Sequence, residues 1–325
     1  MSERSEKKVV GREEWLKHLT SLDKKLYAMY SSVTDCITTD QSLMVVPVDD
    51  HMVHRGDGVF ESFKCVNGNI YNLGDHLERL ERSCSALGLE LPCSIQDMYA
   101  IIVQTVRVSG QYNSLIRLLV SRGQGTMGVN PYACFNPELY IVVYELSSSN
   151  IDCMSEGVSV AISKIPVKPG IFAQVKTCNY LPNVLMKKEA IDLGVDFTIS
   201  LDENGNLGEG ATENIGIVTR NRELLMPPPE RVLAGTTAKR AMVFAQQLVE
   251  EDLLFRADFR PISLEEVYDA SEVHIYGTTL NVTPAVIFEG QPVGDGIPGP
   301  IATRLFEMLH QEMVPDSSRL IQVFE

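Results

Sequence analysis

The sequence predicts two α+β domains that follow a helical extension at the N-terminus. The chain has 325 residues, which is long for one compact core and suits two domains. Segments with the apolar period of strands and segments with the period of helices are mixed in both halves of the chain. They do not alternate strictly, as they would in a doubly wound sheet, so two α+β domains are favoured.

The extension is predicted to cover residues 1–40. Within it, residues 12–30 carry apolar side chains three and four positions apart, which is the spacing of an amphipathic helix. These side chains are Trp15, Leu16, Leu19, Leu22, Leu26 and Met29. A smaller α+β domain is expected at 41–146, and a linker that contains three consecutive serines follows it at 147–152.

Strands are predicted in the first domain at residues 42–47, 59–64, 115–120 and 139–144. The Asn67-Gly68 pair predicts a tight hairpin turn. One helix is expected to begin at a capping Asp75 and to end near Gly88, and a second to cover 95–108. The larger domain is predicted at 153–325, with strands at 158–163, 197–201, 215–218 and 272–276 and helices at 183–193, 236–253 and 298–313.

Bulk composition narrows the classes of partner. Twenty-eight basic and forty-three acidic side chains give a formal charge of −15, which argues against nucleic acid or an anionic membrane as a partner. The seven cysteines form no CxxC pair, so neither a disulfide framework nor a structural zinc site is expected. His51 and His54 lack an evident third ligand, and no metal is predicted. No apolar stretch is long enough to cross a bilayer, and a cytoplasmic location is expected.

Three residues in two short runs indicate the chemistry. Lys176 and Tyr180 lie four positions apart, and Glu209 stands between Gly208 and Gly210. Taken singly, such a lysine is usually a surface charge and such a glutamate a turn residue. Together, an amine, a phenol and a carboxylate are what a pyridoxal phosphate enzyme needs, because the amine forms a Schiff base, the phenol steadies the ring oxygen and the carboxylate pairs with the ring nitrogen. Lys176, Tyr180 and Glu209 are therefore the predicted catalytic and cofactor-binding residues.

The phosphate of this cofactor needs N–H donors and a cation. Gly235-Thr236-Thr237 opens a predicted helix, and Gly277-Thr278-Thr279 follows a predicted strand. Arg79, on the helix expected to begin near Asp75, supplies a charge. The two turns and this arginine are the predicted phosphate site.

These residues make the chain similar to the fold-type IV pyridoxal phosphate enzymes, also called class IV aminotransferases. The resemblance spans roughly residues 47–314, and its blocks stand in the family's order at 55–61, 76–80, 233–237 and 277–284, beside the lysine and glutamate runs. It implies that Lys176 is the Schiff-base lysine, Glu209 the partner of the ring nitrogen and Tyr180 the donor to the phenolic oxygen. Arg79, Thr237 and Thr278 are implied at the phosphate, and a homodimer is implied whose active sites are each lined partly by the neighbouring subunit.

The resemblance also indicates a substrate site. Arg117 stands where branched-chain aminotransferases carry an arginine for the distal carboxylate of glutamate. Arg55 and Leu115 stand where those enzymes carry tyrosines, and the runs around Arg55 and at 167–185 are more similar to plant D-amino acid aminotransferases. Arg55 is expected either to bind a substrate carboxylate or to form an ion pair behind the site. Phe60 and Thr279 complete the predicted substrate set.

The expected activity is transfer of an amino group between a branched-chain L- or D-type amino acid and a 2-oxo acid such as 2-oxoglutarate or pyruvate. Two alternatives stay open at this point. One is an aminodeoxychorismate lyase, which needs the same cofactor residues and releases 4-aminobenzoate and pyruvate. The other is a binding or scaffold protein without catalysis.

Overall fold

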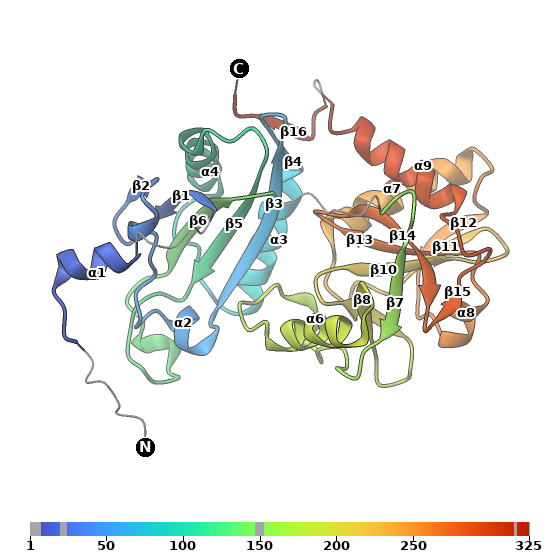
Figure 1. Ribbon diagram of the computed structural model, residues 1–325, viewed down its shortest axis with the longest axis horizontal. Helices are drawn as coiled ribbons and strands as arrows, with labels where there is room; N and C mark the ends of the chain where they lie inside the picture. Colours follow the sequence, from blue (N-terminus) through green and yellow to red (C-terminus); the bar gives the residue numbers. More distant parts are fainter. Residues whose placement is uncertain (1–7, 20–24, 147–152, 315–316, 325) are drawn as a thin grey trace.

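Two β-sheets stand next to each other in the computed structural model, which describes residues 8–19, 25–146, 153–314 and 317–324 (Figure 1). Every pairing in the first sheet is antiparallel, in the order β16-β4-β3-β5-β6-β1-β2. Its strands are β1 (Leu26–Ser31), β2 (Cys36–Thr38), β3 (Gly58–Val66), β4 (Asn69–Tyr71), β5 (Ser114–Ser121), β6 (Glu138–Tyr144) and β16 (Leu320–Gln322). The helices of this half are α1 (Arg12–Leu19), η1 (Gln41–Leu43), α2 (His51–Arg55), α3 (Leu73–Ala86), α4 (Ile95–Ser109) and η2 (Pro131–Ala133).

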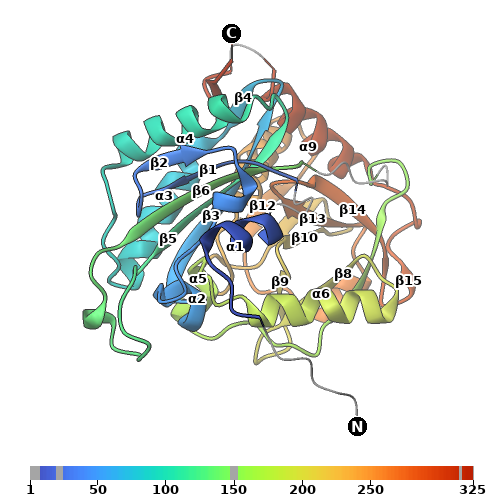
Figure 2. The same cartoon turned by 60° about the vertical axis from the view of Figure 1, so that its left-hand side comes forward.

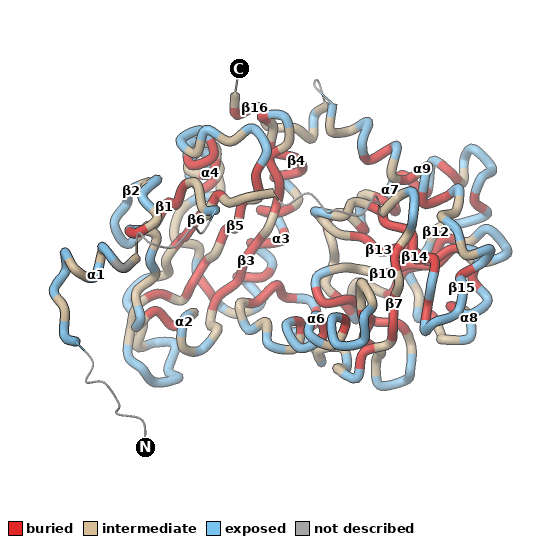
Figure 3. Tube along the Cα trace, in the orientation of Figure 1, coloured by how far each residue is buried: buried red, intermediate tan, exposed pale blue. Residues whose placement is uncertain are grey.

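One face of the first sheet is covered by α3 and α4. Alternation along β3 turns Val59, Phe63 and Cys65 toward these helices, and each of the three is fully buried. The intervening residues, Phe60 and Ser62, point to the opposite face, which looks toward the second sheet. Figure 3 shows the buried strands at the centre of this half. The sheet therefore offers its free face as one wall of a site.

The second sheet closes on itself. Its strands are β7 (Val158–Ile162), β8 (Phe197–Leu201), β9 (Leu207–Gly210), β10 (Asn214–Val218), β11 (Glu223–Met226), β12 (Arg256–Phe259), β13 (Glu272–Gly277), β14 (Asn281–Phe288) and β15 (Gln291–Pro292). The order β10-β13-β14-β7-β8-β9 returns to β10 through a single pair, Asn214 and Glu209. Glu209 thus lies at the closure of a small barrel, where the strand spacing is fixed on both sides.

Helices surround this barrel. They are α5 (Ile171–Gln174), α6 (Leu181–Leu193), α7 (Thr236–Glu250), α8 (Leu264–Tyr268) and α9 (Pro300–Gln311). The helices α7 and α9 share one apolar cluster with β13 and β14, and a second cluster fills the barrel itself. Because α7 packs along its length, its first turn is held in a fixed place at the edge of the second sheet. That turn faces the first sheet.

The fold class and the hairpin at Asn67-Gly68 agree with the sequence prediction. Both turn residues have positive φ, 50° and 78°, as a two-residue hairpin of this type requires. The later helices and strands lie within a few residues of their predicted bounds. Asp75 does not cap α3, which begins at Leu73 after Asn72; Asp75 instead stands in its first turn.

The helix predicted for residues 12–30 is wrong beyond Leu19. Residues 20–24 lie outside the described part of the chain, and residues 26–31 form β1, which pairs with β6 and β2. Leu26 and Met29 continue the helical spacing only by coincidence. Residues 26–31 pair with the edge of β6, and this pairing outweighs the local helical pattern. The strand predicted at 42–47 is also wrong, since η1 covers residues 41–43 and residues 44–47 form no strand.

The boundaries drawn from the sequence do not coincide with the two sheets. Residues 1–40 were expected to stand apart as a helical extension, but β1 and β2 belong to the first sheet. Near the other end of the chain, β16 crosses back and pairs with β4, although the sequence assigns residues 153–325 to the larger domain. The linker predicted at 147–152 lies outside the described residues. Within the described ranges no helix is both long and apolar enough to cross a membrane.

Candidate active site

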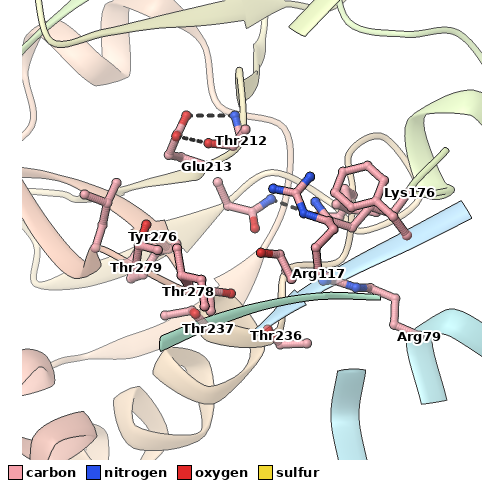
Figure 4. Close-up of a pocket in the computed structure, with 18 of the residues that line it drawn as sticks. Arg79, Arg117, Lys176, Thr212, Glu213, Thr236, Thr237, Tyr276, Thr278 and Thr279 are labelled. Carbon is pink, nitrogen blue, oxygen red and sulfur yellow. Dashed lines mark hydrogen bonds between the residues drawn. The ribbon is translucent and has the colours of Figure 1, made fainter. Parts of the chain in front are cut away.

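A pocket of about 240 Å³, partly open to solvent, lies between the two sheets. Strands β3, β5 and β6 supply one wall, and the first turn of α7 and the turns after β9 and β13 supply the other (Figure 4). The lining residues are Phe60, Ser62, Arg79, Leu115, Arg117, Tyr144, Lys176, Tyr180, Thr212, Glu213, Asn214, Leu233, Gly235, Thr236, Thr237, Tyr276, Gly277, Thr278, Thr279 and Leu280. Most of the predicted site residues therefore meet in one place, although they come from both halves of the chain.

Lys176 reaches the pocket because its segment runs beside β3. The amide of Phe60 donates to the Lys176 carbonyl at 2.9 Å, and the amide of Cys178 donates to the Gly58 carbonyl at 2.8 Å. The Lys176 nitrogen lies 3.3 Å from the Tyr180 hydroxyl and 4.6 Å from the centre of the Phe60 ring. Burial, with the nearby charge of Arg79, lowers the pKa of Lys176 to about 7. A large share of this amine is therefore neutral and nucleophilic near neutral pH.

Tyr180 stands at the start of α6, and its ring packs edge-on against Phe60 with 5.0 Å between ring centres. Burial raises the pKa of its phenol, and the neighbouring charge of Glu209 adds to the rise. The hydroxyl therefore stays protonated beside the Lys176 amine and can donate a hydrogen bond into the pocket.

Glu209 does not line the large pocket itself. It lines a smaller space beside it, which shares Lys176, Tyr180 and Asn214 with the large pocket. One carboxylate oxygen accepts the Leu233 amide at 2.9 Å, and the side chain is only 9% exposed. Burial raises the pKa of Glu209, and nearby cations offset part of that rise. A buried carboxylate of this kind is stabilised by any cation placed against it.

The predicted phosphate site lies where α7 begins. No described side chain caps this helix, so its first amides are free to face the pocket beside the hydroxyls of Thr236 and Thr237. Thr278 and Thr279 follow β13 and line the same region (Figure 4). Arg79 donates through Nη1 to the Ala234 carbonyl at 3.2 Å. A helix start, two hydroxyl-bearing turns and a guanidinium thus lie together at one end of the pocket, and these are the groups that an anion site needs.

A buried network that the sequence did not reveal holds Arg79 in place. Glu61 receives Nε and Nη2 of Arg79 at 2.7 Å each and also contacts His76 Nδ1 at 2.7 Å. His76 Nε2 lies 3.3 Å from the Thr236 hydroxyl. Burial lowers the pKa of His76, and a neutral ring can donate to Glu61 while it accepts from Thr236. The chain of contacts thus connects β3 to the first turn of α7.

Arg117, one of the predicted substrate residues, lines the pocket. Arg117 belongs to β5 and pairs with Ser62 of β3. Its guanidinium carbon lies 4.8 Å from the centre of the Phe60 ring, and its Nη2 donates to the Tyr144 hydroxyl at 3.2 Å. Its Nε is buried and has no hydrogen-bond partner among the described residues. Thr279 and Phe60 line the pocket as well. Arg117 therefore has a buried donor whose hydrogen-bonding capacity is unused among the described residues.

Arg55 does not line this pocket. Its guanidinium donates to the carbonyls of His54 at 2.7 Å, Met127 at 2.6 Å and Gly128 at 3.1 Å. Neither predicted role matches this geometry within one chain, because the side chain pairs with backbone carbonyls rather than with a carboxylate. The side chain holds the loop around residue 128 against α2.

Sequence reasoning missed Glu61, His76 and Lys168. A signal existed for Glu61, because it shares the inward alternation of the apolar residues of β3, and a carboxylate at such a position has to be paired. His76 and Arg79 are three residues apart on α3 and could have been matched to it. Lys168, whose ammonium lies 3.8 Å from Glu209, gave no local signal. No cluster of three potential metal ligands was found in the described part of the chain.

Comparison with known proteins shows which family the chain is similar to. The family model for amino-transferase class IV matches residues 58–287. A chloroplastic D-amino-acid transaminase of Arabidopsis thaliana is 39% identical over 291 residues, which are 89% of this chain and 77% of that protein. A putative branched-chain-amino-acid aminotransferase of Methanocaldococcus jannaschii is 30% identical over 273 residues, 82% of this chain and 91% of that protein.

A solved structure has the same fold as this chain. The branched-chain amino acid aminotransferase of Escherichia coli superposes with a TM-score of 0.82 at 25% identity. The superposition covers 92% of this chain and 100% of that one.

Replacing Glu61 by Gln should destabilise the protein by about 3–5 kcal/mol at neutral pH, because Arg79 is then left buried without its counter-charge. Burial opposes ionisation of Glu61, but Arg79 and His76 hold its pKa at about 2. The pair therefore contributes fully above pH 4.5, the ordinary value, and the difference between variant and wild type should shrink as pH falls toward 2. Urea unfolding at several pH values measures it.

The matched control is Glu78→Gln on the same helix. Glu78 pairs with Arg82 at 2.6 Å, but both side chains are about half exposed, so little loss is expected. Equal unfolding free energies for the two variants would contradict the importance of the Glu61 network.

Proposed function

Because this chain belongs to the class IV aminotransferases, we propose that it transfers an amino group between an amino acid and a 2-oxo acid in the pocket between its two sheets. The observation that carries the proposal is Lys176, a buried amine with its pKa lowered to about 7 and its nitrogen 3.3 Å from the Tyr180 hydroxyl. Such an amine can hold a carbonyl compound covalently and can move a proton.

The cofactor of the proposed reaction is pyridoxal 5'-phosphate, which when bound supplies an aldehyde and a ring that withdraws electrons from the substrate α-carbon. The residues fit such a group. Lys176 would hold its aldehyde carbon, Glu209 its ring nitrogen and Tyr180 its phenolic oxygen. Arg79, Thr236, Thr237 and Thr278 would hold its phosphate, for which the uncapped start of α7 is suited.

Three side chains would act on the reacting atoms. Lys176 Nζ takes and returns the proton at the substrate α-carbon, and its lowered pKa matches that task near neutral pH. Glu209 holds a positive ring nitrogen in place, since its burial makes an unpaired negative charge unfavourable. Tyr180 keeps its proton and donates it as a hydrogen bond.

Arg117 would bind a substrate carboxylate, because its Nε is buried and without a partner among the described residues. The amino donor is of the D-amino acid or the branched-chain L-amino acid type, as the names of the relatives suggest. The lyase alternative gains no support from the relatives described above, which are aminotransferases. Single-turnover spectra with a panel of L- and D-amino acids, with an assay for release of 4-aminobenzoate, would distinguish these reactions. The cytoplasmic location expected from the sequence stays a prediction.

The functional unit of the proposal is a homodimer. Large apolar side chains are exposed on α2, on the loop before β6 and on α6, among them Val53 at 52%, Val129 at 78% and Leu181 at 63%. In Figures 1 and 2, α2 and α6 lie along the same side of the molecule. Arg55 binds the carbonyl of Gly128 at 3.1 Å, so the loop continues this surface. Exposed apolar side chains on these neighbouring elements suit contact with a second copy of the chain.

Replacing Lys176 by Ala should abolish turnover, with a loss of at least ~10²–10⁴-fold, because the proton carrier is removed. The fold should survive, as shown by an unchanged circular dichroism spectrum. Borohydride reduction of the protein loaded with pyridoxal 5'-phosphate, followed by peptide mapping, should label Lys176 in the wild type. Lys188→Ala, an exposed lysine paired with Asp192 on α6, is the control and should keep full activity. Activity of Lys176→Ala close to wild type would refute the assignment.

Replacing Arg117 by Met should raise KM for the carboxylate substrates by roughly 10–100-fold, since a charge-assisted hydrogen bond is worth about 1.5–3 kcal/mol. The Kd for pyridoxal 5'-phosphate should hardly change, because the phosphate residues are untouched. Steady-state kinetics and a spectroscopic titration measure the two quantities. An Arg117→Met variant that loses the cofactor while keeping its KM would contradict the carboxylate role.

Replacing Val129 by Asp should convert the dimer to a monomer, because a buried unpaired charge would be placed in the interface. Light scattering after size exclusion gives the mass. Ile297, which is 68% exposed before α9 and away from this surface, provides the control Ile297→Asp, which should remain dimeric. A wild-type protein of monomer mass that is active would overturn the dimer.

A further inference from the structure

Lys168 lies against the carboxylate proposed to hold the cofactor ring, and neither the proposed reaction nor the sequence gives it a role. Its Nζ lies 3.8 Å from Glu209 Oε1, and its side chain is only 13% exposed. The same ammonium lies 5.4 Å from the centre of the Tyr180 ring. Lys168, Glu209 and Tyr180 line one small space next to the main pocket. A nearly buried lysine is rare unless a counter-charge is present.

The backbone around Lys168 is fixed, so the contact is not a chance orientation of a surface side chain. The amide of Val167 donates to the Leu201 carbonyl at 3.1 Å, which docks the segment on β8. Val167 also occupies the space above Gly208, where an added Cβ would lie 2.1 Å from Val167 Cγ2. Prolines at 166 and 169 restrict the backbone on both sides. The missing side chain of Gly208 therefore lets Lys168 approach its neighbour Glu209.

We propose that Lys168 is the resting counter-ion of Glu209, which keeps this carboxylate ionised in the cofactor-free protein so that it can receive a positively charged ring nitrogen. Lys168 is thus a positioning residue that acts through Glu209 and does not touch the reacting atoms. The inference rests on the proposed function only for the identity of the group that Glu209 receives.

The charges around Glu209 support this role. Burial raises the pKa of Glu209, and the largest opposing influence is Lys168, followed by the hydrogen bond from the Leu233 amide and the charge of Lys176. Glu213, in the turn after β9, acts in the opposite direction as a like charge. Arg79 also interacts electrostatically with Glu209. Without Lys168, Glu209 would keep its proton to a higher pH.

The protonation state of Glu209 sets how many protons are taken from solvent when the cofactor binds. A cofactor that binds with a protonated ring nitrogen needs one proton, which comes from solvent when Glu209 is ionised. When Glu209 already carries a proton, that proton passes from Oε to the ring nitrogen and none is taken from solvent. The Lys168 charge therefore changes the number of protons taken up on binding without any change in the bound state.

Calorimetric titration of the apoprotein with pyridoxal 5'-phosphate, in two buffers of different ionisation enthalpy, measures this number. Lys168→Met should take up fewer protons per site than wild type, by about one at most, at neutral pH. Lys168→Arg, which keeps the charge, should match wild type. In a Glu209→Gln background, adding Lys168→Met should leave proton uptake unchanged, since no carboxylate is left to titrate. Equal proton uptake by wild type and Lys168→Met would overturn the proposal.

A second measurement needs no cofactor, so it separates this inference from the proposed function. Lys168→Met should lower the Tm of the apoprotein at pH 8, and this loss should shrink as the pH is lowered. The reason is that Lys168 lowers the pKa of Glu209, and the stability that it contributes is present only while Glu209 is ionised. Lys168→Gln serves where the Met variant does not fold. If Lys168 acts only by packing on the Tyr180 ring, the loss of Tm persists in the Glu209→Gln background, and the proposal is wrong. Failure of pyridoxal 5'-phosphate to bind at all, with the Tm coupling intact, would refute the proposed function and leave the ion pair standing.

Discussion

Glu61 and Arg79 form a buried pair, bidentate at 2.7 Å, at the junction of the two sheets. Neither charge could be removed from water alone, because the cost of burying an unpaired ion is several kcal/mol. Once paired, the guanidinium still has N–H groups free, since it has five donors and only three are used by Glu61 and the Ala234 carbonyl. The pair therefore fixes an arginine at the pocket wall and leaves part of it available to an anion.

One short segment, residues 233–236, connects the network of Glu61 and Arg79 to Glu209 on the other side of the site. The amide of Leu233 donates to Glu209 and its carbonyl accepts from Asn214 at 2.8 Å, while the next carbonyl, of Ala234, accepts from Arg79. Thr236 then contacts His76. Residues 233–236 thus touch the carboxylate at the barrel closure and the charge network of the first sheet. A displacement of this segment would move Glu209, proposed to hold the ring nitrogen, and the proposed phosphate site together. The packing of α7 therefore anchors both.

Short sequence motifs were enough to single out candidate site residues and the hairpin turn. Features that depend on contacts between segments far apart in the sequence could not be predicted. Lys176 and Glu209 stand in recognisable surroundings, and the hairpin at 67–68 has its own turn signal. In contrast, β1 is a strand only because β6, much later in the chain, offers it an edge. Arg55 was expected either to bind a substrate carboxylate or to form an ion pair behind the site, whereas its side chain donates to the carbonyls of a loop far along the chain. Lys168 could not be matched to Glu209 before Gly208 and Val167 were seen to touch.

The net charge of the chain does not predict the electrostatic field inside the pocket. The chain carries a formal charge of −15, yet Arg117 and Lys176 line the pocket and Lys168 stands beside it. Arg79 adds little net charge, because Glu61 neutralises it at short range. An anion at the start of α7 would therefore be held mainly by oriented N–H groups and hydroxyls, which keep their directions when the pH changes. Arg117 remains for the substrate carboxylate of the proposed reaction, and Lys176, whose pKa is lowered to about 7, for the proton that this reaction would move.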